Sequence, residues 1–154
     1  MLLLAGLAWS AGLIHIQAAF DHLDEYSPYA FCFIATALLQ LIWGGASYRR
    51  PSRRLLWAGI AGSLGVVAAW VLSRTSGLPL GPDARAPETV GLLDTIATLD
   101  ELALSALALS LLLPSLARGR RWAIPHRARV VLRAMALLMV LASSLVLGGG
   151  FHAH

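Results

Sequence analysis

The sequence predicts an all-α membrane protein, a bundle of about five transmembrane helices. Of the 154 residues, 58% are hydrophobic and only 13% are charged, whereas an ordinary soluble domain carries roughly 25% charged residues. The mean hydropathy is +0.71. The apolar residues fall into five runs, each close to the roughly 20 residues that a helix needs to cross a bilayer. We therefore expect a single transmembrane domain over residues 1–154.

The expected spans follow one another with polar connections between them. They cover residues 2–23, 29–47, 55–73, 90–113 and 130–148. The first run has no basic leader, so we interpret it as a retained span and not as a signal peptide. The longest connection, RTSGLPLGPDARAPE, is rich in Gly and Pro and is expected to form a loop between the third and fourth spans.

The charged residues predict how the chain is oriented. All 12 basic residues are arginines, and most lie in two clusters, within residues 49–54 and 118–129, beside apolar spans. The positive-inside rule places both clusters, and the N-terminus, in the cytoplasm, and the C-terminus outside the cytoplasmic membrane. The pI near 10.2 therefore reflects membrane orientation, and we expect no nucleic-acid partner. A single cysteine, Cys32, excludes an internal disulfide and a thiolate metal cage.

The fourth span carries carboxylates inside an apolar helix. An ionisable group in a span costs at least about 2.5 kcal/mol unless a partner or water relieves it, so such groups indicate function. Asp94 and Glu101 are seven residues apart and share one helical face. His15 and His22 repeat that spacing in the first span. With a rise of about 1.5 Å per residue, the two pairs overlap in depth.

The topology predicts that these groups converge in the outer half of the bundle. Gln40 is expected at the depth of Glu101, and the C-terminal histidines at the depth of His22. Asp100 points about 100° away from Glu101 and is expected to serve Arg74 or solvent. The predicted metal ligands are His15, His22, Asp94, Glu101, His152 and His154.

Histidine together with carboxylate is a ligand set for a divalent transition metal, with Zn or Cu favoured over Mn or Fe. The chain contains none of the compact ligand motifs such as HExxH, and other interpretations stay open. The cluster can be a hydrogen-bond network in a structural or accessory subunit, a proton or solute path, or the centre of a metal-dependent intramembrane enzyme. Expected partners are the lipid bilayer and either a second copy of the chain or another membrane protein.

The segment SRTSGLPLGPDARAPETVGLLDTIATLDE, together with GLIHIQAAFDHLDE and RRPSRR before it, resembles a family of uncharacterised small multipass membrane proteins from GC-rich bacteria. The resemblance is most specific at the Arg-Thr-x-Gly-Leu-Pro-x-Gly-Pro loop. It implies a multipass membrane protein and transfers no activity to particular residues. Members often end in a histidine-rich tail, which FHAH resembles, and this implies metal handling by analogy.

Overall fold

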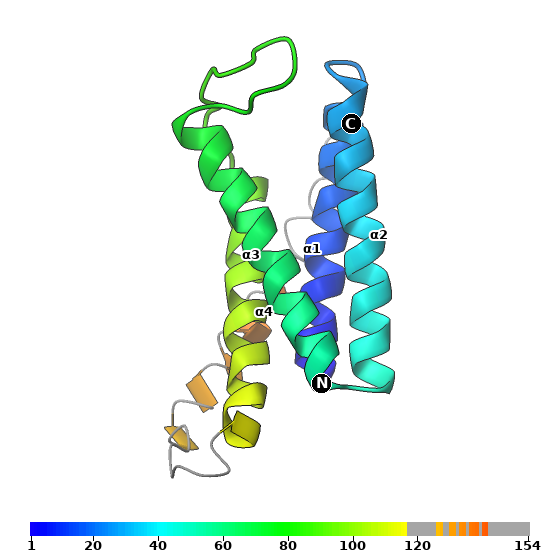
Figure 1. The fold of residues 1–154 in the computed structure, drawn as a ribbon, viewed down its shortest axis with the longest axis vertical. Helices are drawn as coiled ribbons and strands as arrows, with labels where there is room; N and C mark the ends of the chain where they lie inside the picture. The colour runs from blue at the N-terminus through cyan, green and yellow to red at the C-terminus, as the bar shows by residue number, and fades with distance from the viewer. Residues whose placement is uncertain (117–125, 128–129, 132, 135, 139, 142–154) are drawn as a thin grey trace.

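The computed structural model describes residues 1–116, 126–127, 130–131, 133–134, 136–138 and 140–141, and this part of the chain contains helices and connections but no strand. The helices are α1 (Leu2–Asp21), α2 (Ser27–Arg49), α3 (Arg53–Thr75) and α4 (Leu92–Leu116) (Figure 1). All four are long and apolar enough to cross a membrane. The prediction of an all-α membrane bundle is confirmed.

The predicted fifth span, 130–148, falls only partly on described residues. Those described between positions 130 and 141 are helical. Among them Ala136 is 1% exposed and belongs to the same hydrophobic core as α1, α3 and α4. Ala136 therefore packs against the bundle, and the other residues of the predicted span, at 132, 135, 139 and 142–148, lie outside the described part of the chain.

Local sequence explains where the second and third helices begin and end. Pro28 lies in the first turn of α2, where its missing N–H and fixed φ cost nothing. Pro51 follows the end of α2 and disfavours helical geometry at the residue before it. The Ser52 side chain caps α3 by accepting a hydrogen bond from the Leu55 N–H at 3.2 Å. Both helices extend two residues beyond the predicted spans at each end.

The helices form two pairs, α1 with α2 and α3 with α4, which are joined mainly through contacts between α1 and α4 (Figure 1). More than half of the apolar part of α1 and of α4 is buried, but only about a fifth of that of α2 and α3. Helices α1 and α4 are therefore the centre of the bundle. Helices α2 and α3 turn most of their apolar side chains outward, as helices that contact lipid do.

The hydrophobic core lies toward one end of the bundle, which we call the arginine end because it carries the connection between Arg49 and Arg53. The opposite end carries residues 22–26 and the long loop 76–91, and we call it the loop end (Figure 1). The core joins α1, α3 and α4. Its members include Leu4, Leu7, Ala8, Leu56, Ile60, Leu104, Leu107, Ala108 and Leu112.

Trp43 fastens α2 to α3 at the arginine end. Its indole N–H donates to the Leu55 carbonyl at 2.7 Å. Its ring lies against Gly59 so closely that a Cβ at position 59 would overlap it. The glycine at position 59 is therefore required by the close approach of the Trp43 ring. One turn further along α3, a Cβ at Gly62 would meet nothing within 4 Å.

This contrast gives a matched pair of substitutions. Gly62→Ala is expected to stabilise the protein by up to about 1 kcal/mol, because alanine is the better helix former. Gly59→Ala is expected to destabilise it by about 1–3 kcal/mol, because the ring must leave its hydrogen bond to make room. Reversible unfolding in mixed micelles measures both values. Equal effects of the two substitutions would contradict this account of the α2–α3 contact.

Candidate functional site

The central polar contact of the bundle joins His15 on α1 to Glu101 on α4. The His15 Nε2 and Glu101 Oε1 atoms are 3.6 Å apart. His15 is 5% exposed and Glu101 is fully buried. Glu101 lies nine residues into α4, which is about 14 Å from the start of the helix. This pair therefore sits near the middle of the apolar part of the bundle.

Gln40 on α2 completes the cluster, because its side-chain amide donates a hydrogen bond to the Glu101 carboxylate. We call His15, Gln40 and Glu101 the central cluster. The expectation that Gln40 lies at the level of Glu101 is confirmed. One carboxylate thus links three helices, α1, α2 and α4.

The central cluster leaves buried polar atoms unsatisfied. Among the described residues, His15 Nε2, Gln40 Oε1 and Glu101 Oε2 are all inaccessible to solvent and have no hydrogen-bond partner. A buried polar atom without a partner costs about 1–3 kcal/mol, and more when it is charged. Such atoms in a native structure call for an explanation, for example a bound ion or water.

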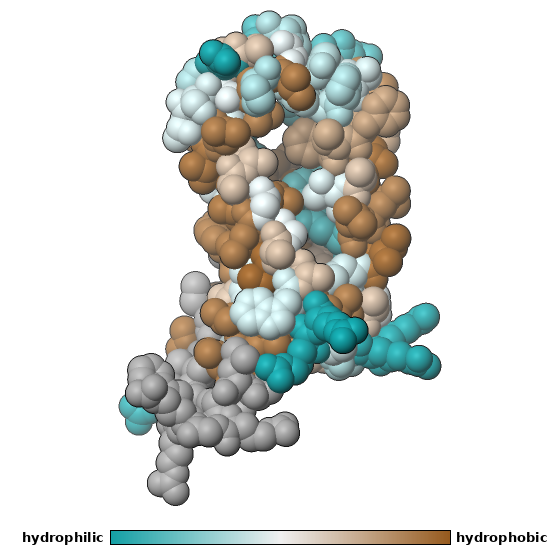
Figure 2. All heavy atoms as spheres, in the orientation of Figure 1, coloured by the Kyte–Doolittle hydropathy of each residue, from teal (hydrophilic) through white to brown (hydrophobic). Residues whose placement is uncertain are grey.

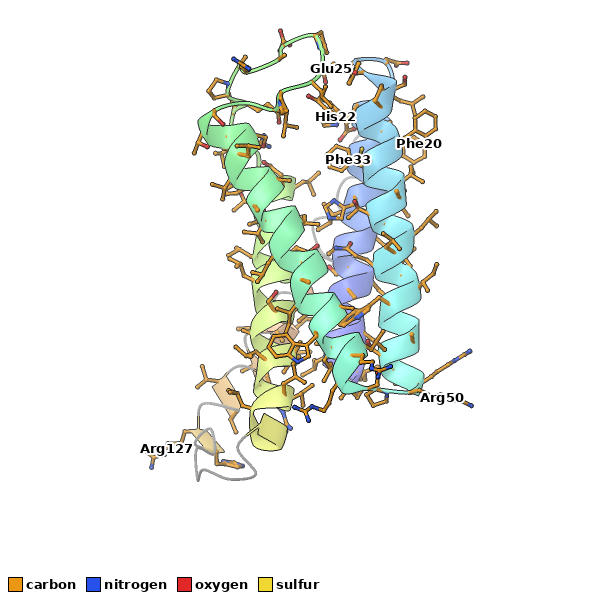
Figure 3. The ribbon with its side chains drawn as sticks, in the orientation of Figure 1. Phe20, His22, Glu25, Phe33, Arg50 and Arg127 are labelled. Atoms are coloured by element: carbon orange, nitrogen blue, oxygen red, sulfur yellow. The ribbon has the colours of Figure 1, made fainter. Side chains whose placement is uncertain are left out.

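Aromatic rings line the cluster on the side of the loop end. The Phe33 ring of α2 stacks on the His15 ring, with centroids 5.9 Å apart. It also contacts the ring of His22, at 5.1 Å. Figure 3 shows His22 and Phe33 below the connection between α1 and α2. Phe33 therefore separates His15 of α1 from His22, which follows the end of that helix.

His22 does not join the central cluster. Its Nδ1 lies 2.8 Å from the Ala18 carbonyl, four residues earlier, which fits an N–H donated from that nitrogen. Its ring packs edge-on to Tyr29 at 6.3 Å. His22 lies just beyond the last residue of α1, as its C-cap, and the Phe33 ring lies between it and His15, so the two histidines have different partners.

Asp94 belongs to a second polar site, at the loop end of the α3–α4 pair. The Asp94 carboxylate is in an ion pair with Arg74 and accepts a hydrogen bond from the Trp70 indole at 2.9 Å. Arg74 also pairs with Glu88 of the long loop. The structure thus brings Asp94 to an arginine and not to the histidines. The signal for this pairing in the sequence is an arginine near the end of one span, Arg74, followed by an acidic residue near the start of the next, Asp94.

The expectation for Asp100 is wrong. Asp100 is fully buried, so it does not serve solvent, and the ion pairs of Arg74 are with Asp94 and Glu88. In fact α4 is central, and its residues near Glu101 face protein on more than one side.

The predicted metal set is therefore only partly assembled in the part of the chain that the structure describes. His15 and Glu101 meet, whereas His22 and Asp94 have other partners. His152 and His154 lie outside the described residues. Within residues 1–116 and the described positions up to 141, no three His, Cys, Asp or Glu side chains form a group that can hold a metal ion. Metal binding stays a prediction.

A contact that the sequence did not predict closes the loop end. The Tyr29 hydroxyl of α2 donates to the Leu80 carbonyl in the long loop. Gly81 follows with a φ of +97° and lies under the Tyr29 ring, so a side chain there would be strained. A cavity of about 50 Å³ lies beside this contact, lined by Glu25, Tyr29, Leu78, Pro82, Asp83, Ala86 and Glu88.

The ion pairs of Arg74 predict that the long loop is held down electrostatically. Arg74→Ala leaves Asp94 without its cation and Glu88 without its anchor. We expect trypsin to cleave after the exposed Arg85 about 5–30-fold faster, which corresponds to a loss of one or two kcal/mol of local stability. Arg50→Ala, an exposed arginine at the other end, is the control. An unchanged cleavage rate in Arg74→Ala would show that the pairs do not hold the loop.

Comparison with known proteins adds no further constraint. No family model, no curated protein and no solved structure matches the chain. The resemblance noted in the sequence therefore stays a prediction.

Proposed function

We propose that this multipass membrane protein, placed in the cytoplasmic membrane, binds a divalent transition metal at the central cluster, with His15 and Glu101 as its protein ligands. The observation that carries the proposal is the set of buried atoms without partners on His15, Gln40 and Glu101. A cation between them would satisfy the histidine nitrogen and the carboxylate oxygens together. Its role would be metal handling or sensing.

The spacing of the two groups supports this assignment. Donor atoms that share a tetrahedral ion with bonds of about 2.0–2.2 Å lie roughly 3.3–3.6 Å apart. The His15 Nε2 and Glu101 Oε1 atoms are 3.6 Å apart. Imidazole and carboxylate suit Zn²⁺, Cu²⁺, Mn²⁺ or Fe²⁺, whereas Cu⁺ prefers sulfur ligands. Two protein ligands leave coordination positions open, which water, another ligand or a residue of the C-terminal tail would fill.

Elemental analysis of protein purified without chelator or nickel resin tests the proposal. We expect close to one metal ion per chain in the wild type, and loss of at least tenfold in occupancy in His15→Ala and in Glu101→Ala. His22→Ala is the matched control, because it removes a histidine from the same helix without touching the cluster. Asp94→Ala removes a carboxylate from the same face of α4 and is also expected to retain the metal.

The C-terminal histidines receive a separate test. If they complete the coordination, replacing both His152 and His154 by alanine lowers metal affinity while the protein stays folded. An unchanged affinity would leave water or an external ligand as the remaining donor. Wild-type protein that is folded, metal-free and unable to take up any of these ions would contradict the metal site itself.

If the protein binds no metal, the second candidate function applies. The protein is then a structural or accessory subunit whose cluster is a hydrogen-bond network. The observation in its favour is the bond from Gln40 to Glu101, which ties α2 to α4 without any metal. Interhelical hydrogen bonds of this kind contribute about 0.6 kcal/mol each. The network alone predicts that Gln40→Leu weakens helix association and that no ion changes the stability of the wild type.

A further inference from the structure

The charged residues of the chain are divided between the two ends of the bundle. All eight acidic residues lie within positions 21–25 and 83–101, at the loop end and in the first part of α4. Four exposed arginines lie in the connection at the other end: Arg49, Arg50, Arg53 and Arg54. Figure 2 shows hydrophilic atoms gathered at this arginine end, next to the apolar surface of the helices. Within the described part of the chain, none of the four arginines is in an ion pair.

Two of these arginines lie over an exposed tryptophan. Arg53 and Arg54 are the first two residues of α3, four and three residues before Trp57, so they are its neighbours on the helix surface. Trp57 is 46% exposed. Arg49 and Arg50 belong to the end of α2, and Figure 3 shows Arg50 pointing away from the helices. The α3 pair therefore stands directly at the edge of an exposed apolar surface.

The indole of Trp57 differs from the other described indoles. Trp9, Trp43 and Trp70 each donate their indole N–H to a group on the neighbouring helix. Trp57 donates to no residue among those that the structure describes. Tryptophan is enriched at membrane–water interfaces, where its ring lies at the level of the lipid head groups. At that level the Trp57 N–H can donate to an ester or phosphate oxygen of a lipid.

The surface of α3 continues from Trp57 as an exposed apolar stripe. Leu64 and Val71 follow at intervals of seven residues, which places them on the face of Trp57, and they are 48% and 45% exposed. The small residues Ala61 and Ala68 lie between them and are exposed as well. The stripe extends over fourteen residues, about 21 Å, which exceeds the roughly 15 Å that one leaflet contributes to the hydrocarbon core. An acyl chain of that leaflet can therefore lie along it.

We propose that the start of α3 binds one phospholipid with an anionic head group. Its phosphate lies against Arg53 and Arg54, and an acyl chain follows the stripe from Trp57 to Val71. Guanidinium groups present paired N–H donors that match phosphate oxygens, and the positive end of the α3 dipole adds to their field. A zwitterionic head group has the same phosphate but also carries a cation, which the arginines repel. This inference is independent of the central cluster and its metal.

Three double substitutions distinguish a lipid site from diffuse attraction. The α3 variant combines Arg53→Gln with Arg54→Gln and removes the pair over Trp57. The α2 variant combines Arg49→Gln with Arg50→Gln and removes the same charge from the end of α2. The lysine variant combines Arg53→Lys with Arg54→Lys, which keeps the charge but loses the paired donors. All four arginines are exposed, so each variant is expected to fold.

The experiment counts lipids bound to the full chain by native mass spectrometry, with detergent-purified protein titrated with dioleoyl phosphatidylglycerol. Detergent removes any effect of the substitutions on membrane insertion. We expect one tightly bound lipid per wild-type chain, with an affinity about tenfold higher than for dioleoyl phosphatidylcholine. We expect the affinity to fall about tenfold in the α3 variant, by less than about threefold in the α2 variant, and by about 3–10-fold in the lysine variant.

The opposite results are equally clear. The positive-inside rule counts charge and not position, so equal losses in the α2 and α3 variants, with the same fold by circular dichroism, would overturn the site in favour of diffuse attraction. Equal affinity for the two lipids would contradict selection of an anionic head group. Glycerol 3-phosphate carries a phosphate without acyl chains, and displacement of the lipid by it at equal concentration would exclude a phospholipid as the occupant. Full affinity in the lysine variant would rule out paired donation by the arginines.

Discussion

The burial of the Glu101 carboxylate is the constraint on which the rest of the bundle depends. A carboxylate in the middle of an apolar helix must find partners inside the protein, because lipid supplies none. It finds them on two other helices, in His15 of α1 and Gln40 of α2. Helix α4 is therefore central, and α1 lies beside it. Helices α2 and α3 are therefore the more exposed pair, because they cover the two buried helices, α1 and α4.

The same constraint separates two kinds of polar site. At the loop end Asp94 has a full cation in Arg74 and an indole N–H from Trp70, so its charge is compensated by protein groups. At the centre Glu101 has a neutral amide and an imidazole, and atoms of the cluster stay without partners. A compensated pair stabilises local structure. An uncompensated cluster is suited to a further ion or ligand, since binding relieves the desolvation of groups already buried.

Aromatic side chains determine how far the bundle is open. Trp43 brings α2 and α3 together at one end through a single hydrogen bond and the space over Gly59. Tyr29 reaches the long loop at the other end. Between these contacts α2 and α3 touch only sparsely, yet the unsatisfied atoms of the central cluster stay inaccessible to solvent. Further along α3, a Cβ at Gly62 or Gly65 would meet nothing within 4 Å, so these glycines make no such contact.

The sequence by itself determined the helical class and the four described spans, because hydropathy and a rise of about 1.5 Å per residue depend on the chain alone. It also placed Gln40 at the level of Glu101, and His15 between the levels of Asp94 and Glu101. Only the tertiary structure decided their partners. Asp94 and Glu101 share a face of α4, yet Asp94 turns to Arg74 and Glu101 to His15. Which neighbour a face meets depends on the order and tilt of the helices, and one-dimensional spacing contains neither.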